Sequence, residues 1–360
     1  MIQRTLHPLL SCTLVASSLW GCGDNAALPA PDAGPPARQV EADVTVDASG
    51  FSDPFTFTVP DGTRSISIVA VGGDALYALG SFHTADGSER VGIDLLTPPG
   101  PAMRANYDTE QIGQMAGGLF QSIRLGTYTH VYPYRPDQAV VAGPTTVRIA
   151  SDVSGPVHVT VVMPAEDGGK VLHLNLIAVS ESLTIPQPAP FVDELQGIFT
   201  PVGIQVVVDD ILELRGTGLS AITDFNEPQE SPTSMSARLP ALVTDRVSAN
   251  ALDIFLVDSL PPGVGGLSLG TPGPPLRGSY YYGVLVRGNT SDAQLARVIA
   301  HEASHFLALQ HVTNVGVSGM IYPDPLDDTQ PNQSNLMTNG TALTADQGFA
   351  LSRSALLQTE

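Results

Sequence analysis

The segment HEASHFLALQH, residues 301–311, holds three of the eight histidines of the chain. On a helix, His301 and His305 are four residues apart, so both imidazoles project from one face, one turn apart, as two zinc ligands must. Glu302 is rotated by about 100° from His301, which places it beside such a metal and not on it. A carboxylate there can accept a proton from a water molecule that zinc has made more acidic. The spacing therefore predicts a zinc site with Glu302 as general base.

The third histidine, His311, reaches the same metal only if the helix ends early. In an unbroken helix it lies about 15 Å along the axis from His301 and off its face. The helix must therefore stop near Ala308, where the chain must turn back. Glycine suits such a turn because it adopts positive φ freely, whereas alanine does so at a cost of roughly 1 kcal/mol or more. Metal bonds can offset that cost. If the turn does not form, Asp327 or Asp328 is the alternative third ligand.

The neighbouring sequence predicts the elements that must position these residues. Ser291, followed three positions later by Gln294, has the pattern of a capping box at the start of the active-site helix. The apolar stripe of this helix consists of Leu295, Val298, Ile299 and Phe306. Thr344 and Gln347 form a second capping pattern, which predicts a C-terminal helix. Hydrophobic patterns predict a helix at 190–199 and strands at 171–179, 204–208, 252–257 and 280–286.

Together, HEASHFLALQH and the later SNLMTNG resemble the metzincin clan of zinc endopeptidases. The clan pattern is H-E-x-x-H-x-x-G-x-x-H, followed by a methionine-containing turn beneath the metal. The resemblance implies one catalytic Zn²⁺ ion, and it assigns these roles: His301, His305 and His311 as ligands, Glu302 as base and Met337 in the turn. It also implies an α+β domain over 170–360, with a mixed sheet, an active-site helix, the methionine turn and a C-terminal helix.

The sequence departs from the clan pattern at two positions. Ala308 stands where the pattern has glycine, and Asn339 stands two residues after Met337, where some branches have a tyrosine. A substrate oxyanion would then depend on zinc itself or on another donor. The segment DPLDDTQPNQSNLM, which precedes this turn, is similar to the pappalysin-like branch of the clan.

The first half of the chain has a different pattern, in which apolar and polar residues alternate between turn signals, as in FTFTVPDGTRSISI and PVHVTVVMP. This period of two predicts antiparallel strands, and we expect an all-β sandwich accessory domain over 42–165. Residues 22–41 are rich in Ala, Pro and Gly, which is typical of a flexible tether. The predicted protein is therefore multidomain, with a β-sandwich before the catalytic domain.

The N-terminus has the features of an export signal. Arg4 precedes the apolar run LLSCTLVASSL, and LWGC at Leu19–Cys22 resembles a bacterial lipobox. We expect a lipoprotein signal peptide over 1–21 and acylation of Cys22, which tethers the protein to the bacterial cell envelope, either in the periplasm or at the cell surface. The alternative is an ordinary secretory signal and a secreted protein. Cys12 and Cys22 are the only cysteines, so the folded part has no cysteine metal ligand and no disulfide.

Charge limits the partners. The formal net charge of −20 gives no basic patch to neutralise phosphates, so we expect no nucleic-acid partner and membrane contact only through the lipid anchor. Asp324, Asp327 and Asp328 are most simply a solvated loop, although clustered carboxylates also suit Ca²⁺. The sequence does not specify the oligomeric state.

The predicted function is a zinc metalloendopeptidase (EC 3.4.24 type) that hydrolyses peptide bonds of a protein or peptide substrate through zinc-activated water. The strand around GVGGLSLG is expected to pair with an extended substrate. The alternative is a non-catalytic cell-surface binding or adhesion lipoprotein, whose zinc is structural or vestigial; a structural site is closed by four protein ligands. A third possibility is a peptidase kept latent by its N-terminal region.

Overall fold

The computed structural model describes residues 37–91, 100, 103, 121–165, 170–180, 183–185, 189–219, 235–279, 281–315, 321–329 and 333–358. Residues 33–360 belong to one compact unit. The signal peptide, Cys22 and most of the expected tether lie outside the described residues. Among the helices that the structure describes, none is both long and apolar enough to cross a bilayer.

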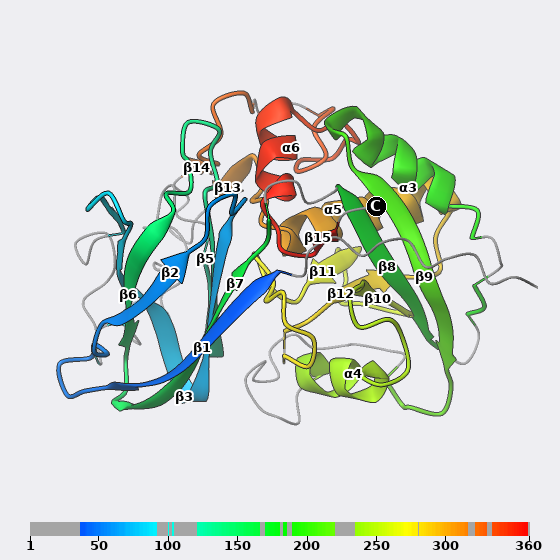
Figure 1. Ribbon diagram of the computed structural model, residues 1–360. Coiled ribbons are helices and arrows are strands. Elements are labelled where there is room, and N and C mark those ends of the chain that lie inside the picture. The colour runs from blue at the N-terminus through cyan, green and yellow to red at the C-terminus, as the bar shows by residue number, and fades with distance from the viewer. Residues whose placement is uncertain are drawn as a thin grey trace, which may run out of the picture. The chain divides into compact units, whose positions relative to one another are not determined.

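Seven strands from the first half of the chain pair antiparallel with one another (Figure 1). They are β1 (Arg38–Val46), β2 (Phe55–Val59), β3 (Ile66–His83), β4 (Glu89–Val91), β5 (Gln121–Tyr132), β6 (Gly143–Ser151) and β7 (Gly155–Met163). The long β3 strand pairs with β5 and β7 through its first part and with β6 and β4 through its second. All seven strands are therefore linked into one sheet through β3, and the two-layer sandwich remains a prediction.

The first strand corrects the expected end of the tether. β1 begins at Arg38, inside the segment 22–41 that composition marks as flexible. Residues 38–41 are ordered because their backbone pairs with β7, from Met163 back to Thr160. Ladder hydrogen bonds with a neighbouring strand determine this boundary, and local composition does not report them.

The second half of the chain forms a mixed six-stranded sheet in the order β11-β12-β10-β8-β15, with β9 also paired to β8. Its elements are β8 (Val171–Val179), α3 (Val192–Phe199), β9 (Gln205–Leu214), α4 (Met235–Val243), β10 (Leu252–Val257), β11 (Gly266–Ser268), β12 (Val284–Arg287), α5 (Asp292–Phe306), β13 (Thr313–Val315), β14 (Ile321–Pro323), α6 (Ala345–Ser352) and β15 (Leu357–Gln358). The central strands β9, β8, β10 and β12 are parallel, whereas β11 and β15 run antiparallel to their neighbours.

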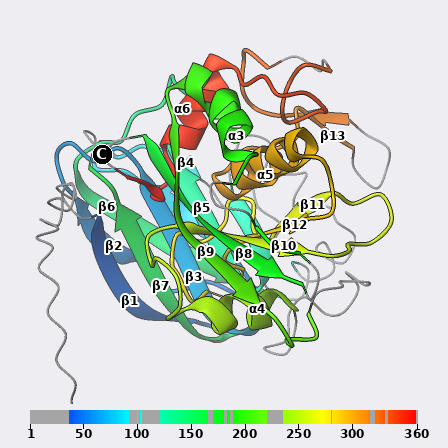
Figure 2. The same cartoon turned by 90° about the vertical axis from the view of Figure 1, so that its right-hand side faces the viewer.

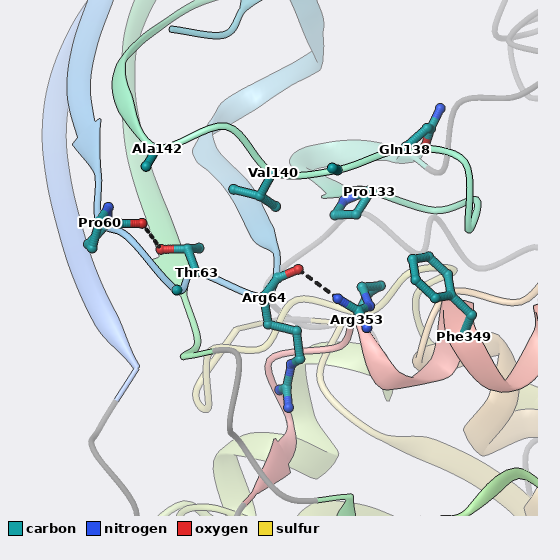
Figure 3. A pocket seen from close by; sticks show the side chains of 11 residues that line it. Pro60, Thr63, Arg64, Pro133, Gln138, Val140, Ala142, Phe349 and Arg353 are labelled. Carbon is teal, nitrogen blue, oxygen red and sulfur yellow. Dashed lines mark hydrogen bonds between the residues drawn. The ribbon is translucent and has the colours of Figure 1, made fainter.

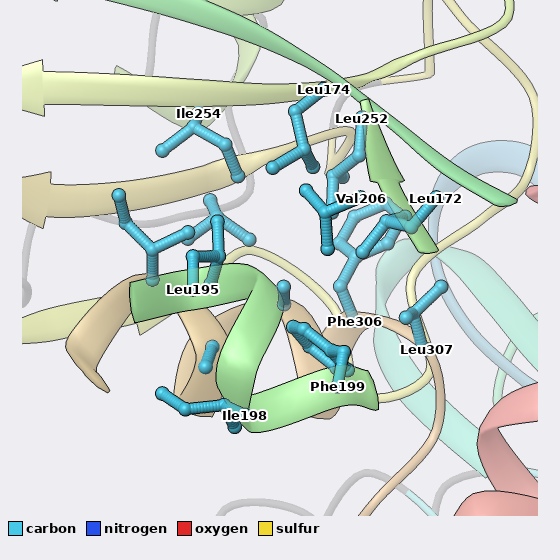
Figure 4. Packing of buried hydrophobic residues seen from close by; sticks show 14 of the residues in the cluster. Leu172, Leu174, Leu195, Ile198, Phe199, Val206, Leu252, Ile254, Phe306 and Leu307 are labelled. Carbon is cyan, nitrogen blue, oxygen red and sulfur yellow. The ribbon is translucent and has the colours of Figure 1, made fainter. Parts of the chain in front are cut away.

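Helices cover both faces of this sheet, with α3 and α5 on one side and α4 on the other (Figures 1 and 2). Alternate residues of β8 explain the arrangement: Leu174 and Leu176 pack toward α3 and α5, whereas Ile177 packs toward α4. Figure 4 shows Leu195 and Phe199 of α3 within the first of these clusters. Strands that are buried on both faces have near-continuous apolar sequences, which is why β8 and β10 match their predicted ranges.

The last residues of the described chain are fastened to the first sheet. Arg64, which is 4% exposed, donates from its guanidinium to the carbonyls of Ser354 and Leu357 at 3.1 and 3.0 Å. Arg353 in turn donates to the Arg64 carbonyl at 3.0 Å. A cavity of about 260 Å³ adjoins this junction, and Figure 3 shows Val140, Phe349 and Arg353 on its wall. None of the histidines of the 301–311 segment lines the cavity.

A buried ion pair anchors the loop between β11 and β12. Arg277 in this loop bonds both carboxylate oxygens of Asp253 at 3.2 and 3.1 Å, and Asp253 also accepts from Asn175 at 2.7 Å. The Asp253 side chain is 1% exposed. The loop then reaches α5, because the Gly273 amide donates to the carbonyl of Phe306 at 2.8 Å. The ion pair therefore fixes to β10 the loop whose Gly273 contacts the last residue of α5.

We expect Arg277→Ala to lower the free energy of unfolding by about 3–5 kcal/mol, because it leaves a buried carboxylate without its partner. The matched control is Arg90→Ala, which removes an exposed ion pair with Asp86 at 3.2 Å and should cost less than about 1 kcal/mol. Urea denaturation at neutral pH measures both. Equal losses in the two variants would contradict the anchoring role.

Candidate metal centre

Helix α5 presents the histidine segment from a well-anchored start. Its N-cap is Ser291, as the sequence predicts, and the Ser291 side chain accepts a hydrogen bond from the Gln294 amide. The predicted stripe of Leu295, Val298, Ile299 and Phe306 is buried. The stripe packs this helix against the sheet and against α3, so the face that carries His301 and His305 is fixed in direction.

The helix ends at Phe306, and the chain turns back two residues later. Ala308 has φ 104°, and it is the one described residue other than glycine with a positive φ. Two bonds close the turn: the Ala308 amide donates to His305 O and the Leu309 amide to Ser304 O. Ala308 is fully buried, so packing holds it in a conformation that disfavours a side chain. The early stop that His311 requires is therefore present.

The turn brings three imidazoles together. Nε2 of His311 lies 3.2 Å from Nε2 of His301 and 3.1 Å from Nε2 of His305. Two nitrogens bound to one tetrahedral zinc ion at about 2.0–2.1 Å lie about 3.3–3.4 Å apart, so both of these distances are close to the value for that ion. The three ligand atoms all lie within 4.8 Å of one another. Among the described residues, these three histidines are the one group of potential metal ligands that converges.

Backbone carbonyls orient two of the rings. Nδ1 of His301 lies 2.7 Å from the Leu336 carbonyl, and Nδ1 of His305 lies 2.7 Å from the Leu309 carbonyl. A carbonyl only accepts, so each Nδ1 carries the proton and each Nε2 lone pair faces the shared centre. The sequence does not indicate which backbone carbonyls orient the rings, because every residue carries this group.

Burial keeps these rings neutral. It lowers the pKa of His301 to about 4. The hydrogen bond with the Leu336 carbonyl stabilises the protonated ring and opposes this shift, but its effect is smaller. Burial likewise holds the pKa of His305 well below its usual value and lowers that of His311. Neutral imidazole is the form that binds metal, so protons compete weakly with a metal at this site.

Glu302 directly follows His301 on α5, and its carboxylate is held by the edge of the sheet. Its Oε2 accepts a hydrogen bond from the Ser268 amide of β11 at 2.9 Å, and the residue is 9% exposed. Burial raises the pKa of the carboxyl to about 7, and the Ser268 amide opposes this shift. A carboxyl with a pKa near neutrality can both take and return a proton at the pH of the cell.

The close approach of β11 to α5 depends on Gly266. A Cβ atom there would lie 2.5 Å from Cγ of Glu302 and 2.8 Å from Cγ1 of Val298. The sequence predicts this stretch as a Gly-rich strand near the substrate. It does not show that the strand also supplies the amide of Ser268 to Glu302, because that contact joins residues 34 positions apart.

Met337 lies in a compact turn and is 1% exposed, within the core cluster of the second half. The turn is locked onto α6, because the Asn335 amide group donates to Gln347 at 3.0 Å while Asn335 accepts from the Met337 amide at 2.8 Å. Gln347 completes the capping box with Thr344, as expected from the sequence. The turn thus places the Leu336 carbonyl against His301.

The acidic residues after β14 do not converge on the histidines or on one another as a ligand group. Asp324 accepts from Thr329, Asp327 pairs with Arg135 at 3.2 Å, and Asp328 accepts from the Asp346 amide at 2.9 Å. The substitution of Asp327 or Asp328 for His311 is therefore unnecessary. The described residues give no support to the calcium site.

No protein-family model matches the chain, and no curated protein sequence does. Among solved structures, the archaemetzincin of Methanopyrus kandleri is 15% identical, with 52% of this chain and 89% of that chain covered and a TM-score of 0.28. Metalloproteinase-II of Bacteroides fragilis is 14% identical, with 54% and 55% covered and a TM-score of 0.34.

The strain at Ala308 can be measured by comparing two buried alanines. Ala308→Gly and Ala296→Gly each remove one fully buried methyl group and each loosen the unfolded chain. Glycine costs about 1 kcal/mol within α5, whereas at position 308 it relieves a left-handed alanine. In chemical denaturation, we expect the free energy of unfolding of Ala308→Gly to be about 1–2 kcal/mol higher than that of Ala296→Gly. Equal stability would mean that the turn is unstrained.

Glu302 should give the metal-free protein a distinctive pH dependence. Its pKa rises to about 7 on folding, so the folded state binds more protons than the unfolded state from about pH 4.5 to 7. The stabilisation that protonated Glu302 allows is therefore present at low pH and is lost as pH rises through 7, by on the order of 3 kcal/mol. Glu302→Gln removes this contribution while the histidine contributions stay.

The measurement is urea unfolding of wild type and Glu302→Gln, both with a chelator, between pH 4.5 and 8. The advantage of wild type over the variant should shrink steadily toward pH 7. A difference that is constant with pH would show that Glu302 ionises normally despite its burial.

Proposed function

We propose that this protein is a zinc-dependent endopeptidase (EC 3.4.24 type). The observation that carries the proposal is the convergence of three neutral imidazoles beside a buried carboxylate on the same helix. Catalytic zinc sites commonly have three protein ligands and leave one position free, whereas structural sites are closed by four. Only three ligands converge among the described residues, which favours the catalytic over the structural kind.

His301, His305 and His311 are the residues that would hold the ion. Their Nε2 spacing, the tautomers of His301 and His305 and the lowered pKa values of all three rings suit a borderline metal such as zinc. A zinc ion bound there supplies Lewis acidity, which polarises a substrate carbonyl and makes water a stronger acid. One such ion is sufficient for the chemistry.

Glu302 moves the proton. Its Oε2 is occupied by the Ser268 amide, so Oε1 is the atom that accepts a proton from the attacking water. The same carboxylic acid then returns this proton to the nitrogen of the departing amine, which completes cleavage of the peptide bond. The hydrogen bond from Ser268 keeps the carboxylate from rotating away between the two steps.

The substrate is proposed to bind as an extended strand along β11. This strand is at the end of the sheet order and pairs with β12 alone among the described strands. Backbone groups on an edge strand can form ladder hydrogen bonds with a peptide of many sequences. Because the Ser268 amide of β11 also donates to Glu302, a peptide paired with β11 would lie in a fixed position relative to the Glu302 carboxylate.

The proposed location is based on the N-terminal sequence. We propose that the chain is exported, acylated at Cys22 and held in the bacterial cell envelope by that lipid alone. The lipobox-like LWGC motif and the Pro-rich residues after it support this proposal. Protein or peptide substrates, and not nucleic acid, fit the strongly acidic chain.

The decisive experiment combines elemental analysis for zinc with hydrolysis of casein by purified wild type and Glu302→Gln. We expect about one zinc per chain in both proteins and at least a 100-fold loss of activity in the variant, because a general base commonly contributes 10²–10⁴-fold. The matched control is Glu213→Gln, the same chemical change at an exposed position of β9.

The control should keep both zinc and activity. A zinc-loaded wild type with no peptidase activity on a range of proteins would instead favour the non-catalytic binding protein. A peptidase that appears only after removal of the N-terminal region would indicate a latent enzyme.

A further inference from the structure

We propose that the loop after β5, residues 133–138, positions the third histidine of the metal centre through Tyr134. The proposal rests on the proposed function insofar as it takes His301, His305 and His311 as a metal site. It assigns to the N-terminal sheet a direct structural part in that site, and it makes Tyr134 a positioning residue that touches no substrate.

Tyr134 leaves its own half of the chain and enters the core of the other. It is 2% exposed, and it is the one member of the second-half core cluster that precedes Leu172 among the described buried residues. The same cluster contains Leu309 and Val312, which flank the His311 segment. A large aromatic side chain buried in this cluster can support the returning chain by packing.

The polar end of Tyr134 also lies at that segment. Burial raises the pKa of its phenol well above the usual value, the Asp324 carboxyl raises it further, and the Gln310 backbone amide opposes them. Gln310 directly precedes His311. Asp324 is joined to the residue after His311, because its amide donates to the Val312 carbonyl at 3.2 Å. The phenol is thus affected by the residue before His311 and by a residue that is hydrogen-bonded to the one after it.

The loop that carries Tyr134 is held together by its own hydrogen bonds. Oε1 of Gln138 accepts from the amides of Tyr134 and Arg135 at 3.0 and 3.2 Å. The Gln138 amide closes the turn by donating to the Arg135 carbonyl at 3.0 Å. Arg135 extends outward to Asp327 at 3.2 Å, which fastens the loop to the segment after β14. A side chain on so constrained a loop can hold its neighbour in one position.

The need for such support follows from Ala308. His301 and His305 are fixed by α5, but His311 lies beyond a left-handed alanine that resists its own conformation. Residues 309–312 are held by the turn bonds, by the 2.7 Å contact of the Leu309 carbonyl with His305, by the 3.2 Å bond from the Asp324 amide to the Val312 carbonyl, and by a long 3.4 Å bond from the Val312 amide to the Met337 carbonyl. Tyr134 is buried in the same core cluster as Leu309 and Val312. Without the ring, the third ligand would be free to sample positions away from the metal.

The test measures metal binding and not only activity. Tyr134→Ala should weaken Zn²⁺ affinity, measured by competition with a chromophoric chelator, by about 10–100-fold, the range seen when residues that orient metal ligands are removed. The absorption spectrum of the Co²⁺-substituted protein should shift from a four-coordinate type, because one histidine is displaced.

The matched control is Tyr128→Ala, which removes a fully buried tyrosine from the core of the first sheet. It should lower the melting temperature by a similar amount yet change Zn²⁺ affinity by less than about threefold. If either alanine variant fails to fold, Tyr134→Leu and Tyr128→Leu, which also remove the ring, replace the pair, and only the first should weaken binding.

A second comparison tests whether the effect passes through His311. In a His311→Ala background, the further change Tyr134→Ala should alter residual Zn²⁺ affinity by less than about threefold, because the ligand it positions is gone. Equal affinities of wild type and Tyr134→Ala, or equal losses in the Tyr134 and Tyr128 variants, would overturn the inference. A wild type that binds no zinc would instead overturn the proposed function.

Discussion

The histidine cluster depends on one backbone conformation, the left-handed turn at Ala308. A helix alone can present only His301 and His305 on one face, and the third ring arrives because the chain reverses two residues after α5 ends. Three imidazole nitrogens cannot be closely spaced on a regular helix, because its rise separates residues ten apart by about 15 Å. The cluster thus requires a local conformation that the alanine side chain opposes and that the surrounding core enforces.

The surrounding structure supplies this enforcement from several directions. The stripe of α5 packs on the sheet, the loop anchored by Arg277 meets the carbonyl of Phe306, and the turn that contains Met337 sets the Leu336 carbonyl against His301. Each contact fixes a ring or a piece of backbone near the centre. Burial then makes the rings neutral and the Glu302 carboxyl weakly acidic, so the electrostatic state of the site follows from its packing.

Spacing along the sequence was sufficient to predict the features that depend on local geometry. The four-residue interval from His301 to His305, the N-cap at Ser291 and the box at Thr344 are properties of a single helix, and the structure has all three features. The buried strands β8 and β10 were predicted because a strand covered on both faces must be apolar throughout.

Contacts between distant segments could not be predicted in the same way. Three of these contacts use backbone groups that every residue carries: the Ser268 amide and the Leu309 and Leu336 carbonyls. The burial of Tyr134 in the second core joins residues far apart in the sequence, which no local pattern reports. The start of β1 at Arg38 was missed for the same reason, since pairing with β7 and not composition makes that segment a strand.

The fastening of Arg64 to the carbonyls near β15 has an evolutionary consequence. Accessory regions that are strung along a chain can be exchanged, lost or duplicated, because their neighbours fold without them. Here a cation from the first sheet satisfies backbone acceptors of the second half, and the reverse bond runs from Arg353. Descendants that discarded the first sheet would have to replace these donors at once, so the two halves are expected to have been inherited as a single piece.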